Sequence, residues 1–167
     1  TGKPPVDGAF VPSNHRSYLD MVVIGAAAPV AFVGRADVRD WPIIEITMKV
    51  SNTIFVDRSD PDSRKKVRAQ VRERLAAGHS VVNFAEGTTN AGTGLLPFKP
   101  GLFYDVIGQP VTVSPVTVVY RVRSARGEQA RAEYVGDDTF VSHLLNLAGH
   151  RGLEAHVHFS EPVRADQ

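Results

Sequence analysis

The chain has 167 residues, of which 43% are hydrophobic and 22% charged, a balance typical of a folded globular protein and not of a disordered chain. Its 19 lysine and arginine residues against 18 aspartate and glutamate residues leave a net charge of +1, so the charge does not indicate a nucleic-acid partner. There is no cysteine, which excludes disulfide frameworks, Cys-ligated metals and thiol nucleophiles. The apolar run from Met21 to Gly34, which has no charged residue, is shorter than the roughly 20 apolar residues that span a bilayer, and Pro29 divides it.

The first half of the chain alternates apolar runs with helical segments. In chain order we expect a strand at residues 9–11, a helix at 18–28 and a strand at 30–33. A second helix at residues 42–49 and a strand at 53–56 follow. The clearest helix follows at residues 61–77, where Asp60 is suited to cap its start and Gly78 lies just beyond its end. Its buried stripe is predicted by apolar residues that recur every four positions, at Val67, Val71 and Leu75.

The second half continues this alternation. We expect a strand at residues 80–84, a Gly- and Thr-rich loop at 86–94 and a helix at 98–107. A strand that Pro115 interrupts follows at residues 111–120, and a turn at 124–128. The last elements are a helix at residues 139–148 and a strand at 153–159. Strands separated by helices favour an α/β fold. We therefore predict a single layered domain over residues 1–167, with a mostly parallel central sheet flanked by helices.

A histidine and a carboxylate stand where the first strand gives way to the first helix. His15 and Asp20 are five positions apart, so they would not share a face of one continuous helix. With His15 in irregular backbone and Asp20 in the first helical turn they can meet, and Asp20 can then fix the tautomer of His15 and leave its other nitrogen as a general base. The alternative is structural: Ser17 and Asp20 form an S-x-x-D capping box.

Three further segments carry candidate ligand-binding residues at or within strands. The loop after residues 80–84 offers backbone N–H groups and hydroxyls that can cradle a phosphate or an oxyanion, and its candidates are Glu86, Gly87, Thr88 and Thr89. Arg58 ends another strand and is suited to bind a phosphate, while Pro115 marks an edge or wall near a site. The structural alternatives are a flexible loop, an ion pair of Arg58 with Asp57, and a simple kink.

In this order, the four segments resemble the glycerolipid acyltransferase family, of the 1-acylglycerol-3-phosphate acyltransferase type. The motif N-H-x-S-x-x-D is met by residues 14–20, an apolar run ending in Asp-Arg by residues 55–58, and a Pro-Val in an apolar strand by Pro115 and Val116. The motif F-P-E-G-T-R-S is met in part by residues 84–89, with Ala85 in place of Pro and Thr89 in place of Arg. This E-G-T-T version resembles the branch that acylates lyso-ornithine lipid.

The resemblance implies an O-acyltransferase that moves a fatty acyl chain from acyl-CoA or acyl carrier protein to the hydroxyl of a lysolipid, in phospholipid or membrane-lipid biosynthesis. His15 and Asp20 would be catalytic, and the substrate-binding residues would be Asn14, Ser17, Arg58, Glu86, Gly87, Thr88, Thr89 and Pro115. Neither a metal nor a cofactor is implied, and the partners would be the lysolipid, the acyl donor and the cytoplasmic face of a membrane. Members usually carry an anchor before the first motif, and because only 14 residues precede His15, we expect it to be absent from this chain.

Four alternatives remain open at the level of the sequence. The acceptor could be lyso-ornithine lipid rather than a glycerophosphate lipid, or a soluble molecule that is no glycerolipid. The same fold could serve as a module that binds lipid or acyl carrier protein without catalysis. A His/Asp pair is also compatible with a hydrolase.

Overall fold

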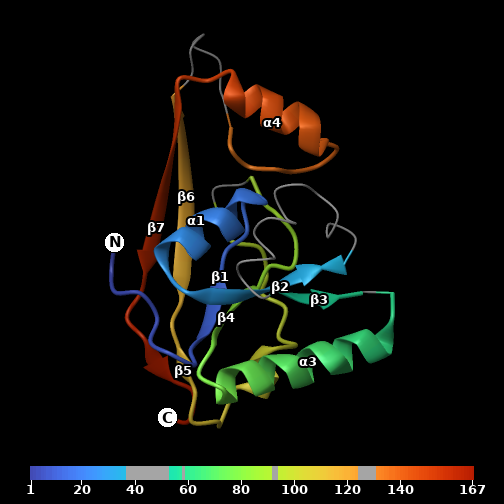
Figure 1. The fold of residues 1–167 in the computed structure, drawn as a ribbon, viewed down its shortest axis with the longest axis vertical. Coiled ribbons are helices and arrows are strands. Elements are labelled where there is room, and N and C mark those ends of the chain that lie inside the picture. Colours follow the sequence, from blue (N-terminus) through green and yellow to red (C-terminus); the bar gives the residue numbers. More distant parts are fainter. Residues whose placement is uncertain (37–52, 58, 92–93, 124–130) are drawn as a thin grey trace.

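A computed structural model describes residues 1–36, 53–57, 59–91, 94–123 and 131–167 (Figure 1). The helix expected at residues 42–49 and the turn expected at residues 124–128 lie outside the described residues, as does Arg58.

A sheet with mostly parallel strands forms the centre of the molecule. β1 (Phe10–Ser13) lies between β4 (Ser80–Phe84) and β5 (Thr112–Val113), and β2 (Val30–Arg35) and β3 (Ile54–Val56) continue the sheet beyond β4. All pairings among these five strands are parallel. The predicted α/β fold with a mostly parallel sheet is confirmed.

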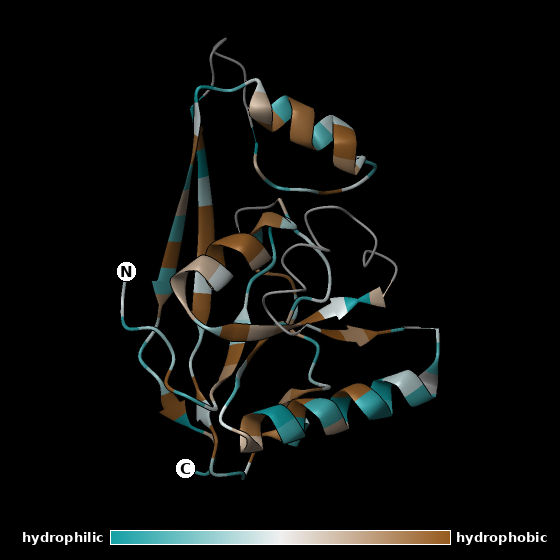
Figure 2. Cartoon of the chain, viewed as in Figure 1, coloured by the Kyte–Doolittle hydropathy of each residue, from teal (hydrophilic) through white to brown (hydrophobic). Residues whose placement is uncertain are grey.

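Helices cover both faces of this sheet. α1 (Leu19–Ala27) packs on one face and α3 (Pro61–Ala76) on the other, as Figure 1 shows. Successive residues of each central strand divide between the two cores because neighbouring side chains of a strand point to opposite faces. Phe10, Ala31 and Val81 pack with α3, and the residues that follow them, Val11, Phe32 and Val82, pack with α1. Figure 2 shows the resulting brown band of apolar strands between the helices.

α3 forms for the reasons that its sequence indicates. The side chain of Asp60 accepts a hydrogen bond of 2.8 Å from the backbone N–H of Asp62, which caps the first turn. Gly78 lies past the end with a φ of 85°, a conformation that glycine adopts without strain. Its predicted apolar stripe is buried in the core.

The last long strands form an antiparallel ribbon that the sequence did not indicate. β6 (Val116–Arg123) pairs along its whole length with β7 (Gly152–Phe159) and joins the sheet through Ser13 of β1. The ribbon runs beyond the sheet toward α4 (Phe140–Ala148), as Figure 1 shows. β8 (Val163–Arg164), a short strand that pairs antiparallel with β5, was also missed.

Two expectations concern prolines, and one of them is wrong. Pro115 does interrupt its strand: β5 ends at Val113 and β6 begins at Val116. The helix expected at residues 98–107 is wrong, because only the 3₁₀ turn η2 (Phe103–Asp105) forms there. Isolated helical hydrogen bonds join the N–H groups of Tyr104 and Ile107 to the carbonyls of Pro100 and Phe103, but they do not continue into a helix, and Gly108 follows with a φ of 74°.

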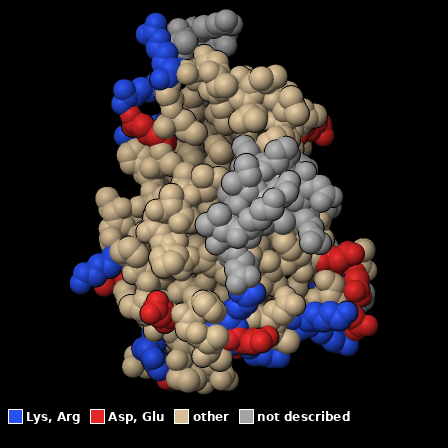
Figure 3. Space-filling model, viewed as in Figure 1, with Lys and Arg blue, Asp and Glu red and all other residues tan. Residues whose placement is uncertain are grey.

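Charged side chains lie mainly around the edge and the lower end of the face drawn in Figure 3. Two of the basic side chains of α3 form ion pairs within the protein. Arg68 and Arg72 both bind the buried carboxylate of Asp105, at 2.7 Å and 3.0 Å. Among the described residues, no helix is long and apolar enough to cross a membrane.

Candidate active site

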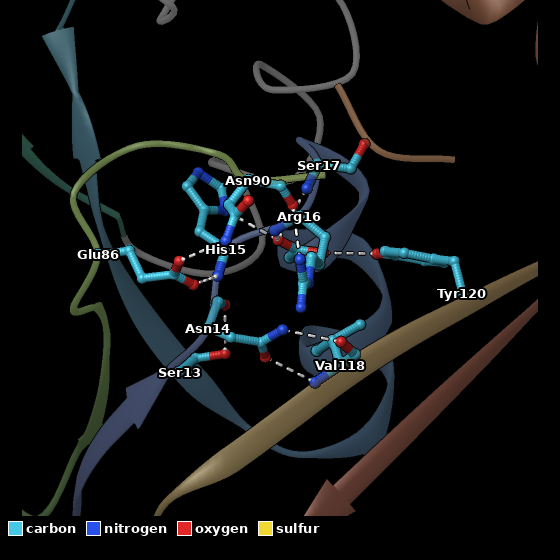
Figure 4. Close-up of polar contacts among 10 residues, drawn as sticks. Ser13, Asn14, His15, Arg16, Ser17, Glu86, Asn90, Val118 and Tyr120 are labelled. Carbon is cyan, nitrogen blue, oxygen red and sulfur yellow. Dashed lines mark hydrogen bonds and ion pairs between the residues drawn. The ribbon is translucent and has the colours of Figure 1, made fainter. Parts of the chain in front are cut away.

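His15 lies in the irregular backbone between the end of β1 and the start of α1. Its Nδ1 is 2.8 Å from Oδ2 of Asp20, so the expected contact between them is confirmed (Figure 4). A carboxylate only accepts hydrogen bonds, so Nδ1 carries the proton and Nε2 of the neutral ring keeps its lone pair. The described residues make no hydrogen bond to Nε2.

The carboxylate of Asp20 is completely buried and accepts four hydrogen bonds. Besides His15, Oδ2 accepts the backbone N–H groups of Arg16 at 2.7 Å and Ser17 at 3.0 Å, and Oδ1 accepts the hydroxyl of Tyr120 at 2.7 Å. These donors compensate the cost of burying the charge. Asp20 therefore both holds the backbone at the start of α1 and orients His15.

Ser17 does not complete the reciprocal capping box. Within the described part of the chain, its buried hydroxyl has no hydrogen-bond partner.

The ring and the backbone of His15 are both fixed. The ring stacks on Phe84 at the end of β4, with centroids 4.0 Å apart and planes 17° from parallel. The backbone N–H of His15 donates to Oε1 of Glu86 at 2.9 Å, and its carbonyl accepts the N–H of Asn90 at 2.9 Å. Only 21% of the side chain is exposed, so the position of Nε2 is set before any substrate arrives.

Glu86 is a buried link between loops. Its Oε2 accepts the backbone N–H of Leu96 at 2.8 Å and the side-chain amide of Asn90 at 3.3 Å, while Oε1 holds His15. The carboxylate therefore joins the segment of His15 to both ends of the Gly- and Thr-rich loop.

A pocket of about 330 Å³ opens beside His15, at the edge where β2, β3 and β4 end. Its wall is partly apolar, with Val33, Val56 and Leu102, and includes two basic side chains, Arg35 and Lys99. No described aspartate or glutamate lines it. The carboxyl ends of parallel strands are the usual place for ligands in open α/β sheets, and this wall suits a ligand with an apolar part and an anionic group.

Gly87 lets Lys99 lie across the loop in this wall. Gly87 has a φ of 71°, and a Cβ at this position would lie 2.9 Å from Nζ of Lys99. The backbone N–H of Lys99 donates to the carbonyl of Ala85 at 2.8 Å, which holds the two segments together. The positive φ therefore favours glycine here, and a side chain at this position would displace the end of Lys99.

A protein-family model described as Acyltransferase matches residues 3–119. The chain belongs to this acyltransferase family. It is 35% identical to the "Lyso-ornithine lipid O-acyltransferase" of Brucella abortus (strain 2308), over 90% of this chain and 61% of the relative. It is 34% identical to the protein of the same name from Pseudomonas aeruginosa, over 98% of this chain and 62% of the relative. A "1-acyl-sn-glycerol-3-phosphate acyltransferase" of Neisseria gonorrhoeae is 32% identical, over 84% of this chain and 56% of the relative.

The acyltransferase chain also shares its fold with a solved structure. The crystal structure of the 1-acyl-sn-glycerophosphate (LPA) acyltransferase, PlsC, from Thermotoga maritima matches with a TM-score of 0.57 at 21% identity. The match covers 96% of this chain and 57% of the other. The chain thus spans about three fifths of the length of the curated relatives that it matches.

The structure divides the predicted site residues of the acyltransferase into two groups. The residues that line the pocket are His15, Gly87, Thr88 and Thr89. The residues that lie outside its lining are Asn14, Ser17, Asp20, Glu86 and Pro115, and Arg58 is not described. The substrate-binding roles of both groups stay predictions.

Asn14 has a structural contact in place of a pocket contact. Its side-chain amide donates to the carbonyl of Val118 at 2.9 Å, and its side-chain oxygen accepts the N–H of Val118 at 2.8 Å. Asn14 therefore fixes the end of β1 to β6, and with it the segment that carries His15.

Sequence reasoning gave no role to several residues of this site. Arg35 and Lys99 line the pocket, and Tyr120 reaches Asp20 from β6. One signal for Tyr120 was available: it follows Val116 and Val118 at inward positions of a strand, and a buried tyrosine needs a partner for its hydroxyl. Among the described residues, no group of three or more His, Asp or Glu side chains could hold a metal ion.

Proposed function

We propose that this chain is the catalytic part of an O-acyltransferase that moves a fatty acyl chain from a thioester to the hydroxyl of a lysolipid in membrane-lipid biosynthesis. The observation that carries the proposal is the His15–Asp20 pair, with Nδ1 of His15 hydrogen-bonded to Asp20 and the residue in the wall of the pocket. Membership of the acyltransferase family supports it, as do the names of the similar proteins.

The mechanism is direct transfer between two bound substrates. Nε2 of His15 takes the proton of the acceptor hydroxyl while the hydroxyl oxygen attacks the thioester carbonyl carbon. The C–S bond then breaks, and the imidazolium returns the proton to the departing thiolate, which leaves an ester and a thiol. Asp20 stabilises the imidazolium between these two steps, so that neither a metal nor a covalent acyl-enzyme is needed.

The pocket supports as acceptor a lysolipid whose head group carries an anionic group. Its basic residues, Arg35 and Lys99, suit a carboxylate or a phosphate, and its apolar wall suits an acyl chain. Thr89 stands where the family motif usually has Arg, which removes one guanidinium from this wall. Together with the similar proteins of that name, this favours lyso-ornithine lipid, and 1-acylglycerol-3-phosphate is the second candidate because Arg35 and Lys99 both line the pocket.

We place the reaction at the cytoplasmic face of a membrane, where acyl-CoA and acyl carrier protein are available as donors. α4 supports a lipid contact because it has no charged residue and exposes Val141, Leu144 and Leu145, which are spaced to share one side of the helix.

The first test is a panel of both lysolipids with acyl-CoA and acyl carrier protein as donors, read by mass spectrometry. We expect an esterified product with at least one lysolipid, and a loss of about 10²- to 10⁴-fold in turnover in His15→Ala. The matched control is His150→Ala, because His150 is outside the pocket lining and its imidazole bonds the side chain of Asn146, away from His15.

Each contrary outcome identifies a different activity. Acyl transfer that persists in a folded His15→Ala variant would overturn the mechanism. Thioester cleavage that needs no acceptor would indicate a hydrolase. Binding of acyl-CoA without turnover over hours would indicate a module that only binds the donor.

A further inference from the structure

Tyr120 is the least expected member of the polar cluster around His15. It lies on β6, 100 residues from Asp20 in the sequence, and its hydroxyl donates to Oδ1 of Asp20 at 2.7 Å. Both side chains are buried. In the described part of the chain, this is the single donor to Oδ1, because the other three bonds of the carboxylate use Oδ2.

The fold holds this hydroxyl firmly in place. The side chain of Asn14 pairs with both backbone groups of Val118, which sets the register between the segment of His15 and β6 (Figure 4). Tyr120 lies two residues further along and therefore points to the same inner face. Burial, followed by the charge of Asp20, raises the pKa of Tyr120, so its hydroxyl keeps its proton and acts as the donor.

A hydrogen-bond donor at Oδ1 of Asp20 changes the charge and the orientation that Oδ2 presents to His15. It stabilises part of the negative charge on the far oxygen, so less of that charge acts on the imidazole. It also prevents rotation of the carboxylate, so that Oδ2 stays directed at Nδ1 of His15. Both effects act through Asp20, since Tyr120 is absent from the lining of the pocket.

We propose that Tyr120 is a positioning residue for acyl transfer, which orients the Asp20 carboxylate and limits how strongly it holds the protonated form of His15. The role of Tyr120 in acyl transfer rests on the proposed function, whereas its effect on the His15–Asp20 pair rests on the geometry alone.

Several other ionisable groups lie around His15 and stay unchanged when only Tyr120 is replaced. Arg16 and Tyr18 belong to its own segment, Asp20 to α1 and Arg35 to β2. Glu86 and Lys99 follow β4, and Tyr134 precedes α4. A difference between the parent protein and Tyr120→Phe therefore reports the one hydroxyl.

The test is the pH dependence of Tyr120→Phe, which removes the hydroxyl and keeps the ring. In the parent and the variant, the ring signals of His15 are followed by NMR as the pH is lowered, without substrate and well below the unfolding temperature of either protein. We expect the midpoint of this titration to move to higher pH by about half a unit or more in the variant, because the charge on Asp20 is less dispersed. The acid limb of kcat/KM for acyl transfer should move in the same direction, with kcat lower by up to about tenfold and KM nearly unchanged.

Two controls separate positioning from general damage. Tyr104→Phe removes an exposed hydroxyl of η2 that does not line the pocket, and should leave the titration of His15 where it is. In an Asp20→Asn background, Tyr120→Phe should cause no further change in kcat, because its effect depends on the carboxylate.

An unchanged midpoint and an unchanged acid limb in folded Tyr120→Phe would overturn the proposal, as would a full additional loss in the Asp20→Asn background. A parent protein without transfer activity would overturn the proposed function instead. The NMR titration would then still decide whether Tyr120 acts on the His15–Asp20 pair.

Discussion

Glu86 and Lys99 carry opposite charges on the same pair of loops, yet only Lys99 lines the pocket. The carboxylate of Glu86 is buried and accepts hydrogen bonds from two backbone N–H groups and from the side-chain amide of Asn90. Nζ of Lys99 lies over Gly87, within the wall that also contains His15. An anionic head group in this pocket would therefore meet a cation and no opposing described acid.

Lys99→Met keeps most of the side chain and removes this charge. We expect KM for the acceptor lysolipid to rise about five- to tenfold while kcat changes little, because the cation binds the head group and not the reacting atoms. Steady-state kinetics with lyso-ornithine lipid and with 1-acylglycerol-3-phosphate measure the effect separately for a carboxylate and a phosphate. Lys65→Met is the control, since Lys65 is exposed on α3 and is not part of the pocket lining. An unchanged KM for both acceptors would show that Lys99 does not contact the head group.

At this scale the sequence predicts local contacts and misses distant ones. The contact of His15 with Asp20 could be predicted because both residues lie within one short segment at a strand-to-helix turn. The contact of Tyr120 with the same carboxylate could not, because it depends on β6 lying beside β1. The same limit applies to the two hydrogen bonds between Asn14 and the backbone of Val118, which lies 104 residues further along the chain.

Among the elements, α4 is attached to the rest of the molecule by a buried histidine. Nε2 of His143 lies 3.1 Å from the carbonyl of Glu133, which can only accept, so this nitrogen carries the proton. Nδ1 then accepts the hydroxyl of Tyr18 at 3.1 Å. Burial lowers the pKa of His143, so the folded protein favours the neutral ring that both bonds require.

This histidine predicts a loss of stability on mild acidification. In the unfolded chain His143 takes up a proton near its ordinary pKa of 6.5, whereas in the folded protein it resists protonation to lower pH. The unfolded state therefore binds more protons below about pH 6.5, and the free energy of unfolding falls as the pH decreases through that range. Thermal unfolding should show a smaller decrease between about pH 7 and pH 5 in His143→Gln, which cannot titrate.

His150→Gln is the matched control for this measurement. His150 is partly exposed and its imidazole bonds a side chain of α4, so its replacement should leave the pH dependence of the parent protein intact. Identical pH profiles for the parent and His143→Gln would contradict the assignment.

Elements with a strong local pattern were predictable, and those set by pairing were not. α3 has a capping aspartate, a stripe of apolar residues and a terminal glycine, and each of these signals is confirmed. The segment at residues 98–107 has helix-like apolar spacing, but it forms only isolated helical hydrogen bonds and the turn η2 before Gly108, which has a φ of 74°. The direction in which β7 pairs with β6 depends on contacts between distant residues, which no local pattern contains.

For the molecule as a whole, the two outer helices differ in how they could meet a lipid surface. α3 is rich in basic residues, but Arg68 and Arg72 are engaged by Asp105. α4 has no charged residue, and its side chains appear tan at the upper end of the face in Figure 3. Its inner residues, such as Phe140, pack on the core, while Val141 and Leu145 remain exposed. An uncharged helix with apolar side chains on two sides is unusual for a surface that contacts only water.

We therefore expect α4 to contact the lipid surface on which the proposed acceptor resides. Leu145 is 67% exposed, and inserting its side chain among acyl chains favours binding by about 1.5 to 3 kcal/mol, which a charge would abolish. Leu145→Asp should thus lower partitioning into phosphatidylglycerol-containing vesicles about tenfold or more in a flotation assay.

Val119→Asp is the control, because Val119 is an exposed apolar residue on β6 rather than on α4. Turnover of a short-chain lysolipid dispersed as monomers should be alike in both variants and the parent, since neither residue lines the pocket. Equal flotation of the parent and Leu145→Asp would show that another surface makes the lipid contact.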